Sequence, residues 1–392
     1  MDLSFSRQEE AFRRELRDWL AANVGALGGV EFDSLDEEVR VLVAWQRRLH
    51  QGGWVGVHWP RAYGGRGASA VENYILQEEM ARAQAPEMIG RIGLNLVGPT
   101  LIAHGTEAQK VRHLPKILAA DEIWCQLFSE PNAGSDLASL RCRAERVGDE
   151  FVVTGQKTWT SYAQFADWGI LLARTDPEAT KSQGISFLIV DMKSAGVTVR
   201  PLRQMTGSDE FNEVFLEEVR VPVANLVGEM NKGWQIAQTT LSHERGTSPR
   251  QLVMHRILLD ALLHLARDTP RGDRTAADDP VIRQKIARIA TEVEIFKLHN
   301  WRTLTQVRRF GKPGPESSLV KLFWSEMSQR LHDVAMEILG PRAQYWSGEP
   351  RAVWNGRWLR SYQYYRAATI FAGTSEVQRN IIAQRVLGLP RG

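Results

Sequence analysis

The spacing of apolar positions predicts helices in the first third of the chain. Leu16, Leu20 and Val24 recur at every fourth position, which places them on one face of a helix. Ser6 and Glu9 have the spacing of a capping box, so this helix should begin just after Ser6. Helical patterns also cover residues 71–83 and 107–120, and they follow a loop rich in Pro and Gly at residues 59–69.

The pattern changes between about residues 123 and 232. Short runs rich in β-branched and aromatic residues, such as residues 151–155 and 184–190, alternate there with turn residues. No pattern long enough for a helix lies between these runs. This arrangement favours an antiparallel sheet over alternating βαβ units.

Helical periods return from Gly233 onward. One long pattern ends at Gly311 and the next at Gly340, which is followed by a proline. The last predicted helix opens with Ser375 and Gln378 in a capping-box relation. Long helices of this kind pack in bundles, and their remaining faces often meet another subunit.

These patterns together predict an α+β multidomain protein. The expected domains are an all-α domain at residues 1–122, a central β-sheet domain at 123–232 and a helical bundle at 233–392. The length of 392 residues agrees with more than one domain, because single cores stop growing near about 250–300 residues.

Charge and cysteine content exclude several classes of protein. The net charge of 49 − 46 = +3 is small for this length and argues against a nucleic-acid partner. Cys125 and Cys142 form no C-x-x-C pair, and the nine histidines show no metal-ligand spacing, so we expect no metal site.

The absence of a signal-like start and of an apolar run near ~20 residues predicts a cytoplasmic protein without a membrane span.

The segment Leu127–Leu140 is a candidate ligand loop. It places Ser129, Glu130, Ser135 and other polar residues among glycine, proline and small side chains. Such a loop can present hydroxyls and free backbone N–H groups to a polar ligand. The alternative is a turn between helix and sheet whose polar residues cap one another, and composition alone favours that alternative.

Trp159 and Ser161 form a second candidate. Both point to the same face of a predicted strand, since alternate strand residues share a face. A tryptophan there can cover a flat aromatic ligand, with the hydroxyl beside it. The alternative is a tryptophan packed in the core of the sheet, which is the more common case.

Glu244 is the third candidate. It continues the helical stripe of Trp234, Ala237 and Leu241. A carboxylate on an apolar helix face is costly unless it is paired or used, and burial would raise its pKa toward that of a general base. A salt bridge to an arginine of a neighbouring helix is the alternative, and the spacing alone leaves both open.

Taken together, several segments resemble the acyl-CoA dehydrogenase family. They include LFSEPNAGSDLAS, GQKTWTSYAQFADWGILLART and FAGTSEVQRNIIAQRVLGLPR, and they follow in the family's order over nearly the whole chain. The resemblance implies an N-terminal helical domain, a central β domain and a C-terminal four-helix bundle. It also implies one FAD per subunit, usually in a homotetramer, and oxidation of an acyl-CoA thioester to the trans-2-enoyl-CoA with electrons passed to an electron-transfer flavoprotein.

The resemblance also assigns roles to individual positions. It implies contacts with FAD for Phe128, Ser129, Trp159, Ser161, Glu337, Gly340, Thr374 and Glu376. It implies contacts with the substrate for Ser135, Arg245, Phe371 and Gly373. The arginine that grips FAD across a subunit interface is either Arg271 or Arg274, because the stretch around them departs from the family pattern.

Ala372 is the departure that matters most. It occupies the position of the usual catalytic glutamate, but it keeps the backbone N–H that binds the thioester oxygen in the family. Members of the isovaleryl and long-chain type carry their glutamate on the helix after the β domain, at the position of Glu244. Periodicity and resemblance therefore point to the same base. The small residues near the α-carbon make a branched, long or polycyclic acyl group plausible, as in actinobacterial members that act on lipid or sterol side chains.

Two other functions stay open. A flavin monooxygenase or oxidase on the same fold would use O2. A partner subunit of a heterotetramer would have little activity of its own, and Ala372 motivates that hypothesis.

Overall fold

The chain forms two compact units, each built from distant segments. The computed structural model describes residues 4–243, 247–311 and 313–390. The first unit takes residues 1–28, 70–85 and 245–392, and the second takes 29–69 and 86–244. The predicted boundaries at residues 122 and 232 stay a prediction, although a β-sheet and helices before and after it are present as expected.

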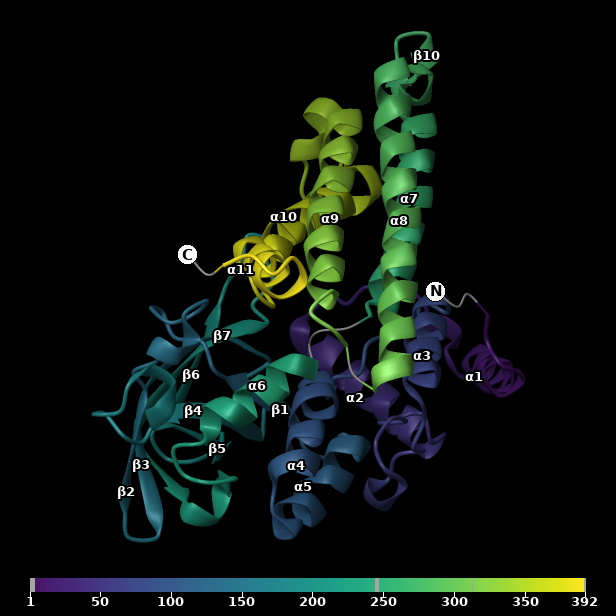
Figure 1. Cartoon of the computed structure of the whole chain (residues 1–392). Helices are drawn as coiled ribbons and strands as arrows, with labels where there is room; N and C mark the ends of the chain where they lie inside the picture. The colour runs from purple at the N-terminus through teal and green to yellow at the C-terminus, as the bar shows by residue number, and fades with distance from the viewer. Residues whose placement is uncertain (1–3, 244–246, 312, 391–392) are drawn as a thin grey trace. The chain divides into compact units, whose positions relative to one another are not determined.

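The first unit is helical. Its helices are α1 (Arg7–Asn23), α3 (Ala70–Arg82), α7 (Pro249–Asp268), α8 (Pro280–Phe310), α9 (Ser317–Leu339), α10 (Arg357–Arg366) and α11 (Ser375–Ile381). The long helices α7, α8 and α9 pack side by side (Figure 1). Their apolar stripes bury one core, whose fully buried members include Leu262, Ile289, Phe296, Met327 and Leu331.

The first helix begins where the sequence predicts. The Glu9 N–H donates to Ser6 Oγ at 3.2 Å, and the Ser6 N–H donates to the Glu9 carboxylate at 2.6 Å. This capping box satisfies two of the N–H groups that a helix leaves unpaired at its start. Arg17 on the same helix donates to both carboxylate oxygens of Glu79, at 2.6 and 2.9 Å, which ties α1 to α3.

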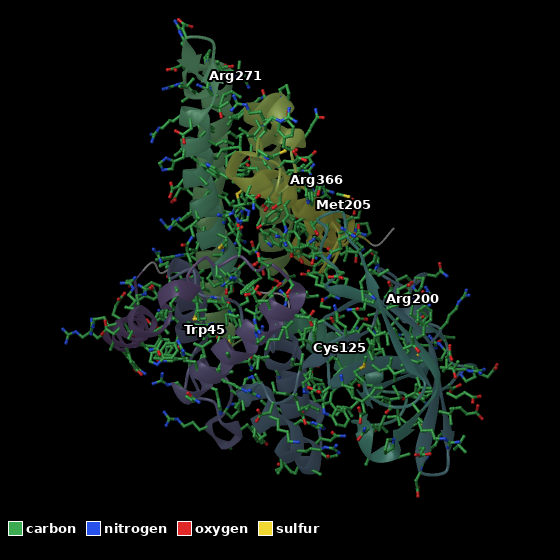
Figure 2. All side chains as sticks on the ribbon, turned by 180° about the vertical axis from the view of Figure 1, so that it is seen from behind. Trp45, Cys125, Arg200, Met205, Arg271 and Arg366 are labelled. Atoms are coloured by element: carbon green, nitrogen blue, oxygen red, sulfur yellow. The ribbon has the colours of Figure 1, made fainter. Side chains whose placement is uncertain are left out.

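The helices of the second unit pack with a sheet. They are α2 (Leu35–Gln51), α4 (Gly98–His104), α5 (Glu107–Ala119) and α6 (Gly233–His243). Trp45 on α2 and Cys125 on the first strand are both buried within this unit (Figure 2). Among the described residues, no helix combines the length and the hydropathy that a membrane crossing requires.

The sheet of the second unit has eight strands in the order β6-β7-β3-β2-β4-β5-β8, with β1 beside β4. The strands are β1 (Trp124–Leu127), β2 (Arg143–Val147), β3 (Glu150–Ser161), β4 (Trp168–Arg174), β5 (Ile185–Asp191), β6 (Val197–Leu202), β7 (Phe211–Pro222) and β8 (Leu226–Val227). Most pairs are antiparallel as predicted, but β1 and β2 both pair with β4 in parallel. The sheet is therefore mixed at this point, because β4 has the parallel neighbours β1 and β2 and the antiparallel neighbour β5.

The C-terminal helices end at the predicted glycines. Gly311 has φ +72° directly after α8, and Gly340 has φ +55° directly after α9, so both adopt conformations that favour glycine. The predicted capping box of the last helix is wrong. The N-cap of α11 is Thr374, whose Oγ1 accepts from the Val377 N–H at 3.2 Å, and Gln378 instead reaches back to the preceding turn.

Candidate functional site

The segment after β1 is held by a buried ion pair. The Lys157 side chain is fully buried, and its Nζ donates to Glu130 Oε1 at 2.8 Å and to the Phe128 carbonyl at 3.0 Å. Glu130 also accepts the N–H groups of Arg141 and Cys142 at 2.7 and 2.8 Å. Each polar group of this cluster therefore has partners, which is the condition under which buried charges are tolerated.

Phe128 and Ser129 lie beside this cluster. The Phe128 ring is buried and contacts Phe187 edge to face, with ring centroids 5.9 Å apart. The Ser129 carbonyl accepts from the Thr158 N–H at 2.9 Å, so the segment runs next to β3. No hydrogen bond from the Ser129 N–H to a described residue is present. This N–H can therefore meet a ligand.

Trp159 is turned outward by an irregularity in β3. The register between β3 and β7 shifts between Lys157 and Thr160, and Trp159 adopts φ +59°. Bulges of this kind re-aim a side chain near functional sites. The indole is 62% exposed although it sits in a sheet, and its nearest aromatic neighbour is Phe211 at 6.2 Å. The alternative of a core tryptophan is thus excluded for this position.

Asn212 forms hydrogen bonds with the backbone beside this register shift. It is fully buried, and its Nδ2 donates to the Thr160 carbonyl at 3.0 Å and to the Glu210 carbonyl at 3.2 Å. The Thr160 hydroxyl is buried and has no hydrogen-bond partner within the part of the chain that the structure describes. Ser161 follows it in a half-buried position. The second unit thus offers an exposed ring, a free N–H and hydroxyl groups, which suit a planar ligand with polar edges.

A strained turn in the first unit forms the other candidate element. Ala372 has φ +53° and Gly373 has φ +89°. Alanine rarely adopts this left-handed conformation, and such strain concentrates at functional sites. Phe371 and Ala372 are exposed, and the Ala372 N–H donates no hydrogen bond to any described residue. A backbone donor without a partner is therefore available here.

Thr374 and Glu376 follow this turn at the start of α11. Thr374 is the N-cap, and Glu376 is exposed. The backbone N–H at Glu376 and the Thr374 hydroxyl lower the pKa of the Glu376 carboxyl. On α9, burial lowers the pKa of Lys321 to about 8, and its Nζ has no hydrogen-bond partner in residues 4–243, 247–311 and 313–390. The carboxylates of Glu376 and Glu326 offset part of this lowering of the Lys321 pKa.

Arg271, Glu337 and Gly340 come together at the end of α9. Arg271 lies on the hairpin β9 (Pro270–Arg271) and β10 (Arg274–Thr275), and it donates to the carbonyls of Glu337 at 2.9 Å and Ile338 at 3.1 Å (Figure 2). These carbonyls are unpaired at a helix C-terminus, so the arginine caps α9. Arg274 stands opposite Arg271 in the backbone register of the β9–β10 hairpin, and it is exposed.

Family models match the chain in three consecutive parts. They are the acyl-CoA dehydrogenase N-terminal domain at residues 6–121, the middle domain at 125–219 and the C-terminal domain at 231–387. The chain belongs to the acyl-CoA dehydrogenase family. It is an oxidoreductase of that family, and it has the family's helical, β and helical parts in this order.

Several acyl-CoA dehydrogenases are similar over their full length. Acyl-CoA dehydrogenase IpdE1 of Mycobacterium tuberculosis is 40% identical and is matched over 97% of this chain and 98% of its own. The ChsE4-ChsE5 complex of Mycobacterium tuberculosis contains a chain that is 36% identical, with a TM-score of 0.86 and full coverage of both chains. The Tcur3481-Tcur3483 steroid ACAD contains one that is 34% identical, with a TM-score of 0.85 and full coverage of both.

For three expected site residues, Glu244, Arg245 and Ser135, the structure shows no contact that bears on the expected role. Glu244 and Arg245 lie outside the described residues, which resume after α6 at Thr247. Ser135 is exposed in the loop before β2. Among the residues that the structure does describe, no cluster of His, Cys, Asp and Glu is arranged to hold a metal ion.

Sequence reasoning misses two residues that organise the candidate elements. Lys157 lies in GQKTW, between β-forming residues, and a lysine within a central strand is a signal of a buried pair. The second residue is Gln378, whose spacing from Ser375 predicts a part in a helix cap. Its side chain instead donates to the Ala372 carbonyl, and the spacing alone does not distinguish these two interactions.

Proposed function

We propose that this chain is an FAD-dependent acyl-CoA dehydrogenase that converts an acyl-CoA thioester to its trans-2-enoyl-CoA. The turn at Ala372 carries the proposal. It keeps an unengaged backbone N–H where family members bind the thioester oxygen, and it lacks only the carboxylate. Negative charge grows on that oxygen as the α-proton leaves, so a preorganised donor lowers the barrier.

The residues of this chain fit a flavin. In the second unit, Trp159 would cover a flavin ring system, and the Ser129 N–H and the Ser161 hydroxyl would bind its polar atoms. In the first unit, the Thr374 hydroxyl is a separate candidate for a contact with FAD, as the family resemblance implies. FAD, when bound, supplies the two-electron acceptor for the hydrogen that leaves the β-carbon.

Glu244 is our candidate for the general base. Its position follows α6, where Ile236 and Ala237 are buried, so the buried face of the helix carries apolar side chains. A carboxylate near such a face would have a raised pKa and would accept the α-proton readily. Arg245 is the neighbouring residue that we expect to meet the substrate.

Steroid-derived thioesters are the substrate class that we favour. The support is the name of a structural relative, a steroid ACAD at 34% identity, together with the absence of a side chain larger than methyl at Ala372 and Gly373. A bulky acyl group needs room near its α-carbon, and two small residues leave that room.

Assembly with a second, related chain is part of the proposal. Two structural relatives are described as paired complexes, ChsE4-ChsE5 and Tcur3481-Tcur3483. A homotetramer is the alternative that the family pattern implies. We expect an electron-transfer flavoprotein to accept the electrons, whereas a monooxygenase or oxidase would react with O2.

An anaerobic titration tests the proposed function. The chain, alone and co-expressed with a related chain, is purified and its yellow colour and FAD content are measured. Acyl-CoA thioesters with straight, branched and steroid-derived acyl groups are then added without oxygen, and the bleaching of the yellow flavin absorption is followed.

The proposal predicts bleaching by at least one steroid-derived thioester and formation of the matching enoyl-CoA. Rapid oxygen consumption by the reduced protein would instead identify a monooxygenase or oxidase. A colourless protein in both preparations would favour an assembly role without catalysis.

A further inference from the structure

We propose that Gln378 is the positioning residue that holds the Ala372 N–H toward the substrate's thioester oxygen. This inference rests on the proposed function, because it concerns the donor of that same site. Gln378 does not contact the reacting atoms in this proposal. It acts through the conformation of the turn between Phe371 and Thr374.

The backbone at Ala372 is constrained from both sides. On the upstream side, the Phe371 N–H donates to the Ala367 carbonyl at 3.0 Å. On the downstream side, Gln378 Nε2 donates to the carbonyls of Ala372 and Gly373, both at 3.3 Å. The Phe371 N–H lies one peptide plane before the plane that carries the Ala372 N–H, so the latter plane stands between the two anchored points. The φ and ψ angles of Ala372 relate it to the plane of the Ala372 carbonyl, and the clamp on that carbonyl therefore helps to hold the left-handed φ of +53° and the direction of the N–H.

A second glutamine reinforces the upstream side. Gln329 on α9 donates from Nε2 to the carbonyls of Tyr365 and Arg366, both at 3.3 Å, and to the Thr369 hydroxyl at 3.1 Å. These contacts hold the end of α10 and the turn that follows it. The chain up to the Phe371 N–H is thus anchored independently of Gln378, so a change at position 378 should affect chiefly the turn after it, which includes the peptide plane that carries the Ala372 N–H.

The side chain of Gln378 is placed for this task. It is only 2% exposed, and its Nε2 lies 2.5 Å from where a Cβ on Gly373 would stand. Gly373 is therefore the residue that lets the amide approach the two carbonyls. A donor suits this buried position, because an apolar side chain would remove the partner that both carbonyls have here and an anionic side chain would repel them.

Loss of the Gln378 amide would remove the two hydrogen bonds that hold the carbonyls of the strained turn. Alanine prefers right-handed or extended backbone, so loss of the clamp should let φ of Ala372 relax and turn the N–H away. Removal of one oxyanion donor elsewhere slows catalysis by about 10²–10³-fold. A misdirected donor should cost part of this, on the order of 10- to 100-fold in flavin reduction, with little change in substrate affinity.

The test compares Gln378→Glu, Gln378→Leu and Gln378→Asn with the unchanged FAD-loaded protein. Glutamate keeps the size but removes the donor, leucine removes polarity, and asparagine keeps the amide on a side chain too short to reach both carbonyls. The probe is a bound enoyl-CoA product labelled with ¹³C at the thioester carbonyl. Infrared difference spectroscopy measures its C=O stretch, which falls in frequency when the oxygen accepts a stronger hydrogen bond.

Gln46→Glu is the matched control. Gln46 is also a fully buried glutamine that bridges backbone groups, since it donates to the Ile117 carbonyl at 2.9 Å and accepts the Gly90 N–H at 2.8 Å. It belongs to the other unit. Its replacement should lower stability without changing the carbonyl frequency.

In the unchanged protein we expect the bound C=O stretch to lie below that of the free thioester in water. All three position-378 variants should lose most of this shift, and acidification should restore part of it in Gln378→Glu only, because a protonated carboxyl regains one donor. A full shift in any folded, FAD-containing variant would overturn the role of Gln378. No shift in the unchanged protein would instead refute the proposed role of the Ala372 N–H itself.

Discussion

Replacement of Lys157 by methionine should destabilise the sheet unit more than any exposed charge change. Methionine keeps most of the length and the apolar stem but removes the ammonium group. Glu130, only 8% exposed, would then keep its backbone donors but lose its cationic partner at 2.8 Å. The Phe128 carbonyl would lose its partner at 3.0 Å as well.

The expected magnitude follows from the burial of the pair. Breaking a buried ion pair by removing one partner costs about 3–5 kcal/mol, because the other charge stays buried without its cationic partner. The two backbone donors that Glu130 keeps place the expected cost near the lower end of this range. The pair between Arg220 and Glu150 provides the contrast, since its side chains are 66% and 40% exposed. Pairs of that kind contribute about 0–1 kcal/mol. The two substitutions Lys157→Met and Arg220→Met should therefore differ by at least about 2 kcal/mol.

Urea unfolding followed by tryptophan fluorescence measures the difference, with FAD content determined in parallel. Lys157→Met should lower the unfolding midpoint and reduce FAD retention, because Phe128 and Ser129 lose their support. Adding Glu130→Gln should recover part of the stability, since the uncompensated charge is then removed. Equal, small effects of Lys157→Met and Arg220→Met would refute the reasoning.

Two further predictions concern the two units. Burial lowers the pKa of His255 and of His332 to about 4, so the folded chain keeps both neutral while the unfolded chain binds protons below about pH 6.5. The free energy of unfolding is therefore unaffected by these histidines above about pH 6.5 and falls as the pH is lowered toward about 4. Urea midpoints across this range should fall less steeply in His332→Gln, and an unchanged pH dependence would contradict a buried, neutral His332. Gly98→Ala should destabilise the second unit by roughly 3 kcal/mol, because the new Cβ would stand 2.0 Å from the Trp59 ring, whereas Gly134→Ala meets nothing within 4 Å and should leave the melting temperature unchanged.

Local patterns are sufficient to predict most of the elements. The capping box at Ser6 and Glu9 places the start of α1, and the glycines at 311 and 340 place the ends of α8 and α9, because each signal acts through nearby backbone groups. The parallel pairing of β1 with β4 is not predictable in this way. It depends on which strands meet across long connections, and strand composition carries no such information.

The candidate site is predictable only in part. The residue types at positions 128, 129 and 159 match the family pattern. The outward orientation of Trp159, however, depends on a register shift between β3 and β7 that no local sequence signal predicts. The predicted N-cap at Ser375 is wrong because Thr374 and Ser375 are both good N-cap residues and the local sequence does not separate them. In the structure Thr374 caps the helix, and Gln378 donates to the carbonyls of Ala372 and Gly373 instead of joining a capping box.

The location of the base is the central claim, and Glu244→Gln tests it most directly. Stopped-flow mixing of the FAD-loaded variant with a reactive acyl-CoA, without oxygen, gives the rate of flavin bleaching, while FAD content and ligand affinity are measured separately. We predict a rate at least about 100-fold below that of the unchanged protein, in line with the usual contribution of a general base, with FAD and ligand still bound. Bleaching at a near-normal rate would contradict the account and require a base elsewhere in the chain or in a partner subunit.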